Sequence, residues 1–201
     1  MRVAVIGTGN IGGTLGRALA RAGHEVMFGS RHPLEEAARG AVAGGTAAAV
    51  TTVGAAVEAA DLVLVAVPGP AVDAFVAEHR DRLAGKLVLD ATNRVGGGGP
   101  ANSAAVFAQL VPSARYARVF NTLGWENFDD PDFAGVRADM FFSAPSGDRA
   151  AVEDVVEGVG LRPIYVGEGQ HEVVDGVLRL WFALAIGQQR GRRLAFKLLE
   201  K

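Results

Sequence analysis

Three glycines near the amino terminus have the spacing of a phosphate-binding turn. Residues 7–12 read Gly7-Thr8-Gly9-Asn10-Ile11-Gly12 and fit the pattern G-x-G-x-x-G. The motif follows a short apolar run, Arg2–Ile6, and leads into a helical pattern over Ile11–Arg21. In that setting the first glycine permits a tight turn, the second leaves room for a pyrophosphate, and the third lets the helix pack close to the strand. Because the chain has 27 glycines, the match alone could be a simple turn. The strand before it and the helix after it favour a dinucleotide site, with the pyrophosphate at the helix N-terminus.

A second predicted strand, Glu25–Phe28, ends in a segment that could distinguish between dinucleotides. NAD enzymes usually carry Asp or Glu about 20 residues beyond the glycines, where it binds the adenosine ribose. Here the segment reads Gly29-Ser30-Arg31-His32 and has no carboxylate. Ser30 could hydrogen-bond a 2′-phosphate, Arg31 could bind it through two N–H groups, and a protonated His32 could add a donor. An exposed Arg31 that only caps a helix is the alternative. The absence of Asp or Glu at this position and the presence of Arg31 together favour NADP(H) over NAD(H).

Polar residues follow three more predicted strands, where ligands bind in open α/β sheets. Neutral amides and hydroxyls suit a nicotinamide carboxamide and its ribose, and a proline could shape the wall beside the diphosphate. Each residue alone could equally make an ordinary turn. As a set they predict further contacts to the coenzyme from Val67, Pro68, Thr92, Asn93, Asn121 and Thr122.

The order of the elements predicts the fold. Strand patterns lie at Arg2–Ile6, Glu25–Phe28, Ala47–Thr51, Leu62–Val67, Lys86–Asp90, Arg118–Phe120, Asp139–Ser143 and Pro163–Val166. Helical patterns lie between them at Ile11–Arg21, Glu35–Ala38, Val53–Ala60, Ala71–Ala84, Ser103–Val111 and Arg149–Gly158, with a glycine loop at Gly96–Gly99. Wholly apolar strands that alternate with helices are typical of a parallel sheet covered on both faces. We predict an α/β fold with a doubly wound, mostly parallel sheet (a Rossmann fold) over residues 1–168. A C-terminal helical segment follows at 169–201, with Gly187 and Gly191 dividing it into two helices.

Composition excludes several classes of function. A net charge of −2 gives no reason to expect nucleic acid or an anionic membrane as partner. The absence of cysteine removes disulfides, thiolate metal sites and cysteine nucleophiles, and no other metal-ligand spacing is visible. No apolar run approaches the roughly 20 residues that a spanning helix needs. We therefore expect a soluble, cytoplasmic protein without a metal site.

The motifs together resemble the coenzyme F420-dependent NADP reductase family. The likeness rests on residues 7–12, 29–31, 67–68, 91–93 and 119–123, and it extends to a tail ending Ala195-Phe196-Lys197-Leu198-Leu199. It implies NADP(H) on a Rossmann domain, a small C-terminal helical part, and hydride exchange between NADPH and the deazaflavin F420. Residues 123–128 depart from the reductases proper, so the resemblance defines the NADP(H) site and leaves the acceptor open: F420, a flavin or a similar conjugated molecule.

Few side chains are candidates for acid–base chemistry. Hydride transfer to a conjugated ring mainly needs correct position and a dry pocket. His79 is expected to face solvent and His24 to be structural, which leaves His171 at the entry to the tail, either as a pocket residue or as a helix start. Trp125 and Phe128 could line the substrate pocket or pack as ordinary core.

Three functions remain open from the sequence. The first is an NADPH-dependent reductase of a deazaflavin, flavin or similar acceptor, which we expect to form a homodimer through the apolar face of the tail. The second is an imine reductase or hydroxyacid dehydrogenase, although these need a longer helical part. The third is an NADP(H) sensor without catalysis.

Overall fold

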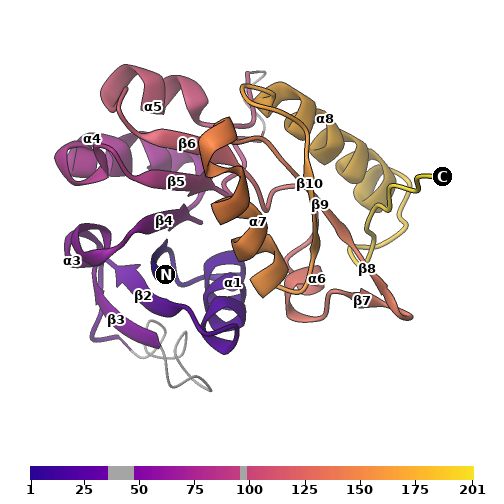
Figure 1. Ribbon diagram of the computed structural model, residues 1–201, viewed down its shortest axis with the longest axis horizontal. Coiled ribbons are helices and arrows are strands. Elements are labelled where there is room, and N and C mark those ends of the chain that lie inside the picture. The colour runs from indigo at the N-terminus through magenta and orange to yellow at the C-terminus, as the bar shows by residue number, and fades with distance from the viewer. Residues whose placement is uncertain (36–47, 96–98) are drawn as a thin grey trace.

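The computed structural model describes residues 1–35, 48–95 and 99–201, and its centre is a six-stranded parallel sheet (Figure 1). The strand order is β3-β2-β1-β4-β5-β6, which is the order of a doubly wound dinucleotide-binding fold. All five pairings in this sheet are parallel. The strands are β1 (Arg2–Ile6), β2 (Glu25–Ser30), β3 (Ala48–Thr52), β4 (Leu62–Val65), β5 (Leu87–Asp90) and β6 (Arg115–Arg118). The predicted fold class is confirmed.

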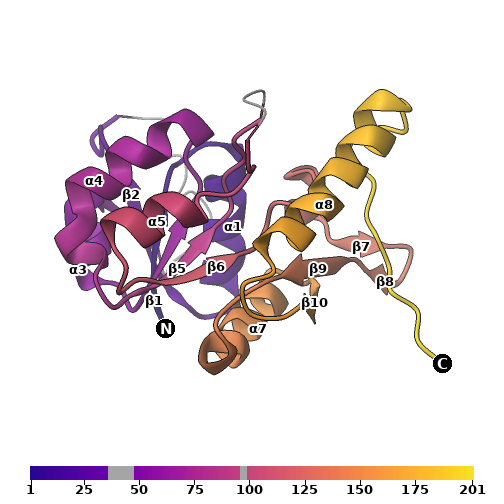
Figure 2. The ribbon, with the colours of Figure 1, turned by 90° about the horizontal axis from the view of Figure 1, so that it is seen from above.

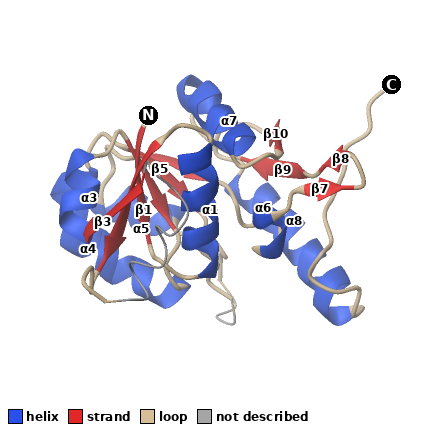
Figure 3. Cartoon of the chain, turned by 90° about the horizontal axis from the view of Figure 1, so that it is seen from below, coloured by secondary structure: helices blue, strands red, loops and turns tan. Residues whose placement is uncertain are grey.

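Helices cover both faces of this sheet (Figures 2 and 3). One face packs against α1 (Asn10–Arg21) and α7 (Arg149–Gly158). The other face packs against α3 (Val53–Ala59), α4 (Val72–Leu83) and α5 (Ala104–Leu110). Because the central strands β4 and β5 are buried on both sides, their sequences are apolar almost throughout. This burial explains why the periodicity predicted most of these elements to within a few residues.

Strand β6 is displaced from its predicted position. The predicted span was Arg118–Phe120, whereas the strand runs over Arg115–Arg118 and pairs with β5. It ends because Phe120 has a φ of 62°, in the left-handed region, where an extended strand cannot continue. The carboxyl edge of the sheet therefore begins earlier at β6 than the sequence suggested.

The chain beyond β6 forms smaller sheets. Strands β9 (Asp139–Phe142) and β10 (Arg162–Tyr165) pair in parallel in a sheet of their own. An isolated antiparallel bridge pairs Arg118 of β6 with Ser143, the residue that follows β9. The short helix α6 (Glu126–Asp129) and a two-stranded hairpin of β7 (Asp132–Phe133) and β8 (Val136–Arg137) were not predicted.

The C-terminal segment has one helix instead of the predicted two. Helix α8 spans His171–Phe182 and continues as a wider π-helical turn to Gly187. Residues 188–201 then run back without helix (Figure 2). The chain reverses at Gln189 and Gly191, both with positive φ. Asp139 holds the returning segment, because its amide donates to Phe196 and its carboxylate accepts from the amide of Leu198. A second helix would lose these contacts.

Some predictions fall partly outside the described residues, namely the helical pattern at Glu35–Ala38 and the loop at Gly96–Gly99. The domain division at 168/169 stays a prediction. In the described part of the chain no helix is long and apolar enough to cross a membrane. The same part contains no group of three or more His, Asp or Glu placed to hold a metal ion.

Candidate functional site

A cleft of about 750 Å³ runs along the carboxyl edge of the parallel sheet. Its walls come from the β1–α1 turn, the ends of β2, β4 and β5, helix α4, and a loop after β6. Most of the residues predicted to bind the coenzyme line it: Gly7, Thr8, Gly9, Asn10, Ile11, Ser30, Arg31, His32, Val67, Pro68, Thr92 and Asn93. The cleft therefore lies where parallel α/β sheets bind ligands.

The three motif glycines have the geometry expected of a pyrophosphate site. Gly7 has a φ of 112°, and a Cβ there would lie 2.6 Å from the carbonyl oxygen of Ala66. A Cβ on Gly12 would lie 2.0 Å from the carbonyl oxygen of Gly7, so only glycine allows α1 to begin this close to β1. A Cβ on Gly9 would meet nothing within 4 Å. The backbone of Gly9 thus faces open space that a ligand could enter. Gly7 and Gly12 are needed for the turn itself.

Helix α1 begins at this turn without a side-chain cap. Its N-cap is Gly9, which has no side chain to accept from the first N–H groups, and no acidic residue lies in the first turn. Those N–H groups and the positive end of the helix dipole therefore need an external acceptor. An anionic phosphate fits this arrangement.

The end of β2 forms a basic rim of the cleft. The Ser30 hydroxyl accepts a hydrogen bond from the His32 amide at 3.0 Å, which keeps the loop tight. His32 and Arg31 are exposed, and Nδ1 of His32 lies 3.8 Å from a carboxylate oxygen of Glu35. Glu35 also lines the cleft, so this rim carries one acid beside the two bases.

Helix α4 contributes a buried histidine that sequence reasoning misplaced. His79 was expected to face solvent, but it is only 7% exposed and lines the cleft beside Phe75. It falls on the buried stripe formed by Val72, Phe75, Val76 and Leu83, and this helical spacing could have identified it. Burial lowers the pKa of His79, which favours the neutral ring.

His79 belongs to the same end of the cleft as Ser30. A Cβ placed on Gly54 of α3 would lie 3.9 Å from its Cε1 atom, and α3 starts directly after Thr52, which pairs with Ser30. The described titratable residues that line the cleft, Arg31, His32, Glu35, Glu78 and His79, therefore gather at the β2 end.

The opposite end of the cleft is formed by the loops after β4 and β5. A Cβ on Gly69 would lie 2.6 Å from the carbonyl oxygen of Asn93, so these two loops touch. The Thr92 hydroxyl is buried and donates to Asp90 at 2.6 Å, while Asn93 is half-buried at the wall. Trp125 completes this end and is the aromatic side chain there. Its position matches one of the two placements that the sequence left open.

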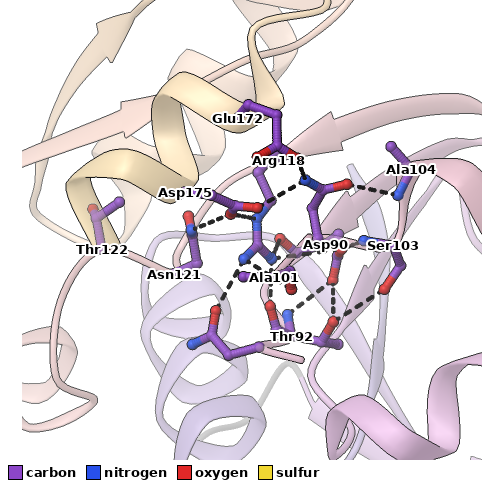
Figure 4. A network of polar contacts seen from close by, with 12 residues as sticks. Asp90, Thr92, Ala101, Ser103, Ala104, Arg118, Asn121, Thr122, Glu172 and Asp175 are labelled. Carbon is purple, nitrogen blue, oxygen red and sulfur yellow. Dashed lines mark hydrogen bonds and ion pairs between the residues drawn. The ribbon is translucent and has the colours of Figure 1, made fainter. Parts of the chain in front are cut away.

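A buried polar network lies behind this wall, and the sequence did not predict it (Figure 4). Arg118 is fully buried and donates from Nε to Asp175 of α8 at 2.9 Å. Its other nitrogens donate to the carbonyl oxygens of Asp90, Thr92 and Ala101 and to the Asn93 side chain. The network joins β5, β6 and α8 directly beneath the residues that line the cleft.

Hydrogen bonds satisfy both carboxylates of this network. Asp90 accepts from the hydroxyl of Tyr116 at 2.5 Å and from the amide of Ser103 at 3.0 Å, besides its two bonds from Thr92. Burial, together with the charge of Asp90, raises the pKa of Tyr116, so the hydroxyl keeps its proton. Asp175 accepts from Asn102 at 2.7 Å. A signal was present in the sequence, because Asp90 is a charged residue at the end of an otherwise apolar strand.

Five predicted site residues are not among the described residues that line the cleft: Gly12, Asn121, Thr122, Phe128 and His171. Gly12 packs behind the turn, as its predicted role requires. Asn121 and Thr122 are buried, the first against Asp175 and Arg118 and the second against Met140, so neither lies among the described lining residues.

Phe128 and His171 are not among the described residues that line the cleft, and each takes the other placement that the sequence left open, as core and as a helix start. Phe128 is 1% exposed and packs edge-on against Phe120 at a centroid distance of 5.8 Å. It is core because the short helix α6, which the sequence did not reveal, turns it inward. The His171 ring packs on Tyr116 with centroids 4.9 Å apart, and burial lowers its pKa. As the first residue of α8 it supports the network behind the cleft wall.

Comparisons with known proteins agree with this geometry. Residues 2–94 match the family model described as NADP oxidoreductase, coenzyme F420-dependent. A provisionally assigned F420-dependent NADP reductase from Arthrobacter sp. FB24 has a similar structure over 100% of both chains, with a TM-score of 0.79 and 24% identity. A hypothetical protein from Sinorhizobium meliloti covers 100% of this chain and 96% of its own, with a TM-score of 0.73 and 25% identity.

Two further groups share part of their length with this chain. A reductive aminase from Aspergillus terreus, solved with NADPH and ethyl levulinate, has a TM-score of 0.70 at 23% identity over 92% of this chain and 62% of its own. A glycerol-3-phosphate dehydrogenase [NAD(P)+] from Pseudomonas savastanoi is 29% identical over 124 residues, 56% of this chain. The chain spans only about a third of the length of such curated relatives, as the match covers 36% of that sequence.

The matched segment contains the glycine turn, the basic rim and the wall formed by Thr92 and Asn93. Over residues 2–94 the chain is therefore similar to the NADP oxidoreductase family described as coenzyme F420-dependent.

Proposed function

We propose that this protein binds NADP(H) in the cleft and transfers hydride between it and a flat conjugated acceptor, such as the deazaflavin F420 or a flavin. The observation that carries the coenzyme assignment is the continuous cleft from the bare Gly9 to the Ser30–Arg31 rim. The uncapped start of α1 suits the pyrophosphate, and the rim suits the 2′-phosphate on the adenosine ribose. The dihydronicotinamide would then reach toward Asn93 and Trp125.

Arg31 is expected to decide the preference for the phosphorylated coenzyme. Replacing it in Arg31→Ala should weaken NADPH binding by about 1–3 kcal/mol, roughly 5- to 150-fold, because a charge-assisted hydrogen bond to the 2′-phosphate is lost. NADH has no such phosphate and should bind as before. Isothermal titration calorimetry with both coenzymes measures this, with Arg21→Ala at the far end of α1 as control. Equal losses for NADPH and NADH would show that Arg31 does not contact the 2′-phosphate.

The acceptor end of the cleft favours chemistry that needs no acid from the protein. Among the described lining residues, this end presents Thr92, Asn93 and Trp125, none of which titrates near neutral pH. When bound, the reduced coenzyme supplies a hydride from C4 of its nicotinamide. A conjugated ring can delocalise the incoming electron pair and take its proton from water at its solvent-facing edge, so the residues here need only position the two rings against each other. The Trp125 ring offers a flat apolar surface for such an acceptor.

The imine reductases are the competing model. Their fold is similar, but this chain spans only about three fifths of the length of the reductive aminases. Reduction of a simple imine or keto acid also requires a proton at the reacting atom, and the described residues at this end of the cleft supply no titratable donor. The conjugated acceptor is therefore favoured.

A panel of acceptors tests the proposal. The purified protein should oxidise NADPH, followed as loss of its near-ultraviolet absorbance, when F420 or FMN is supplied. Cyclic imines and 2-oxo acids should give no turnover above background. Turnover of an imine alone would reject the conjugated acceptor, while NADPH binding without turnover of any acceptor would favour the sensor. The homodimer and the cytoplasmic location stay predictions.

A further inference from the structure

Asn93 lines the cleft, and its side chain also contacts the buried network. It lines the wall at the end formed by β5, and its Oδ1 accepts a hydrogen bond from an Arg118 terminal nitrogen at 2.9 Å. A guanidinium only donates, so it can bind the oxygen of the amide and not its NH₂ group. The contact therefore fixes which way round the amide stands.

Because Oδ1 of Asn93 already accepts from Arg118, Nδ2 of the same amide is available to a ligand in the cleft. Nδ2 of Asn93 has no hydrogen-bond partner among residues 1–35, 48–95 and 99–201. We propose that Arg118 is a positioning residue that makes Asn93 present a hydrogen-bond donor, and that this donor selects a carbonyl oxygen, that of the nicotinamide carboxamide. This inference rests on the proposed NADP(H) function and adds the recognition of the base to it.

Arg118 is itself held rigidly enough to act in this way. It is fully buried, and Asp175 of α8 fixes its Nε at 2.9 Å. Its remaining donors engage backbone carbonyl oxygens, among them those of Thr92 and Ala101 (Figure 4). A planar guanidinium with this many fixed acceptors has one orientation available. Helix α8 therefore helps to shape the cleft through one side chain, although neither Asp175 nor Arg118 is among the described residues that line it.

Two variants and their combination test the inference. Asn93→Ala removes the donor, and Arg118→Lys keeps the buried positive charge but replaces the planar group with an ammonium that cannot reach both Asp175 and Asn93. The probes are NADP⁺ and 2′-phospho-ADP-ribose, which lacks the nicotinamide base. Arg2→Lys is the matched control, because Arg2 also lies on a sheet strand and pairs with a carboxylate, Asp61, far from the cleft.

Each single variant should lower the affinity for NADP⁺ by about 3- to 10-fold, the worth of one hydrogen bond. Affinity for 2′-phospho-ADP-ribose should stay within about twofold. In the double variant the loss should be no larger than in Asn93→Ala alone, because Arg118 acts through Asn93. The control should change neither probe. Calorimetric titration provides all these values.

Several results would overturn the inference. Equal losses for the two probes in Arg118→Lys, or losses that add in the double variant, would mean that Arg118 only supports the fold. If Arg118→Lys does not fold, Asn93→Ala decides alone, and an unchanged preference for NADP⁺ over 2′-phospho-ADP-ribose rejects the inference. If the unmodified protein binds neither probe, the proposed function itself fails, and the two failures are thereby told apart.

Discussion

The variant Gly12→Ala is expected to bind NADP(H) roughly 100-fold more weakly than the unmodified protein. The added Cβ would lie 2.0 Å from the carbonyl oxygen of Gly7 and 3.3 Å from the Cβ of Ala66. Because the first of these atoms belongs to the backbone, either α1 or the glycine turn must move. A shift of about 1 Å in a binding turn can cost roughly 100-fold, and we expect a loss of that order. Calorimetric titration with NADPH measures it.

The neighbouring glycine provides the control. A Cβ on Gly13 would lie 3.2 Å from the tip of the Arg17 side chain, which is flexible, and 3.5 Å from the Thr8 carbonyl oxygen. Gly13→Ala should therefore bind NADPH nearly as well as the unmodified protein, and alanine should favour the helix. Similar affinities for the two variants would show that close packing of α1 on the turn is not what creates the site.

Removing the guanidinium of Arg118 should have the largest effect on stability. Arg118→Met leaves the carboxylates of Asp90 and Asp175, both fully buried, without their shared cation. Breaking a buried ion pair by removing one partner typically costs about 3–5 kcal/mol. The free energy of unfolding, measured with urea, should fall by about this amount.

An exposed pair gives the matched comparison. Arg2 and Asp61 are bonded at 2.6 Å, but their side chains are 53% and 48% exposed. Arg2→Met should therefore leave the unfolding midpoint almost unchanged, because water replaces the lost contact. If both variants shift the midpoint equally, burial is not the reason that Arg118 matters.

The first half of the fold could be predicted because its signals are local. The glycine spacing, the apolar strands β1, β4 and β5, and the amphipathic α1 are each readable within a few residues. Their order implies one sheet with a known binding edge. The structure accordingly places Ser30 and Asn93 along one cleft, 63 positions apart in the sequence.

The remainder depends on contacts between distant segments. Arg118 and Asp175 are 57 residues apart, and periodicity carries no information about such a pairing. The tail is extended because Asp139 binds it, and that contact likewise spans 59 residues. His79 differs, since its place on the apolar stripe of α4 was readable, but the many charged residues of that helix obscured it.

Titration of the unmodified protein with NADP⁺ and NAD⁺ in parallel tests the central claim most directly. The account predicts saturable binding of NADP⁺, at least about tenfold tighter than that of NAD⁺, because only NADP⁺ offers a phosphate to Ser30 and Arg31. Tighter binding of NAD⁺, or no heat with either coenzyme, would contradict it.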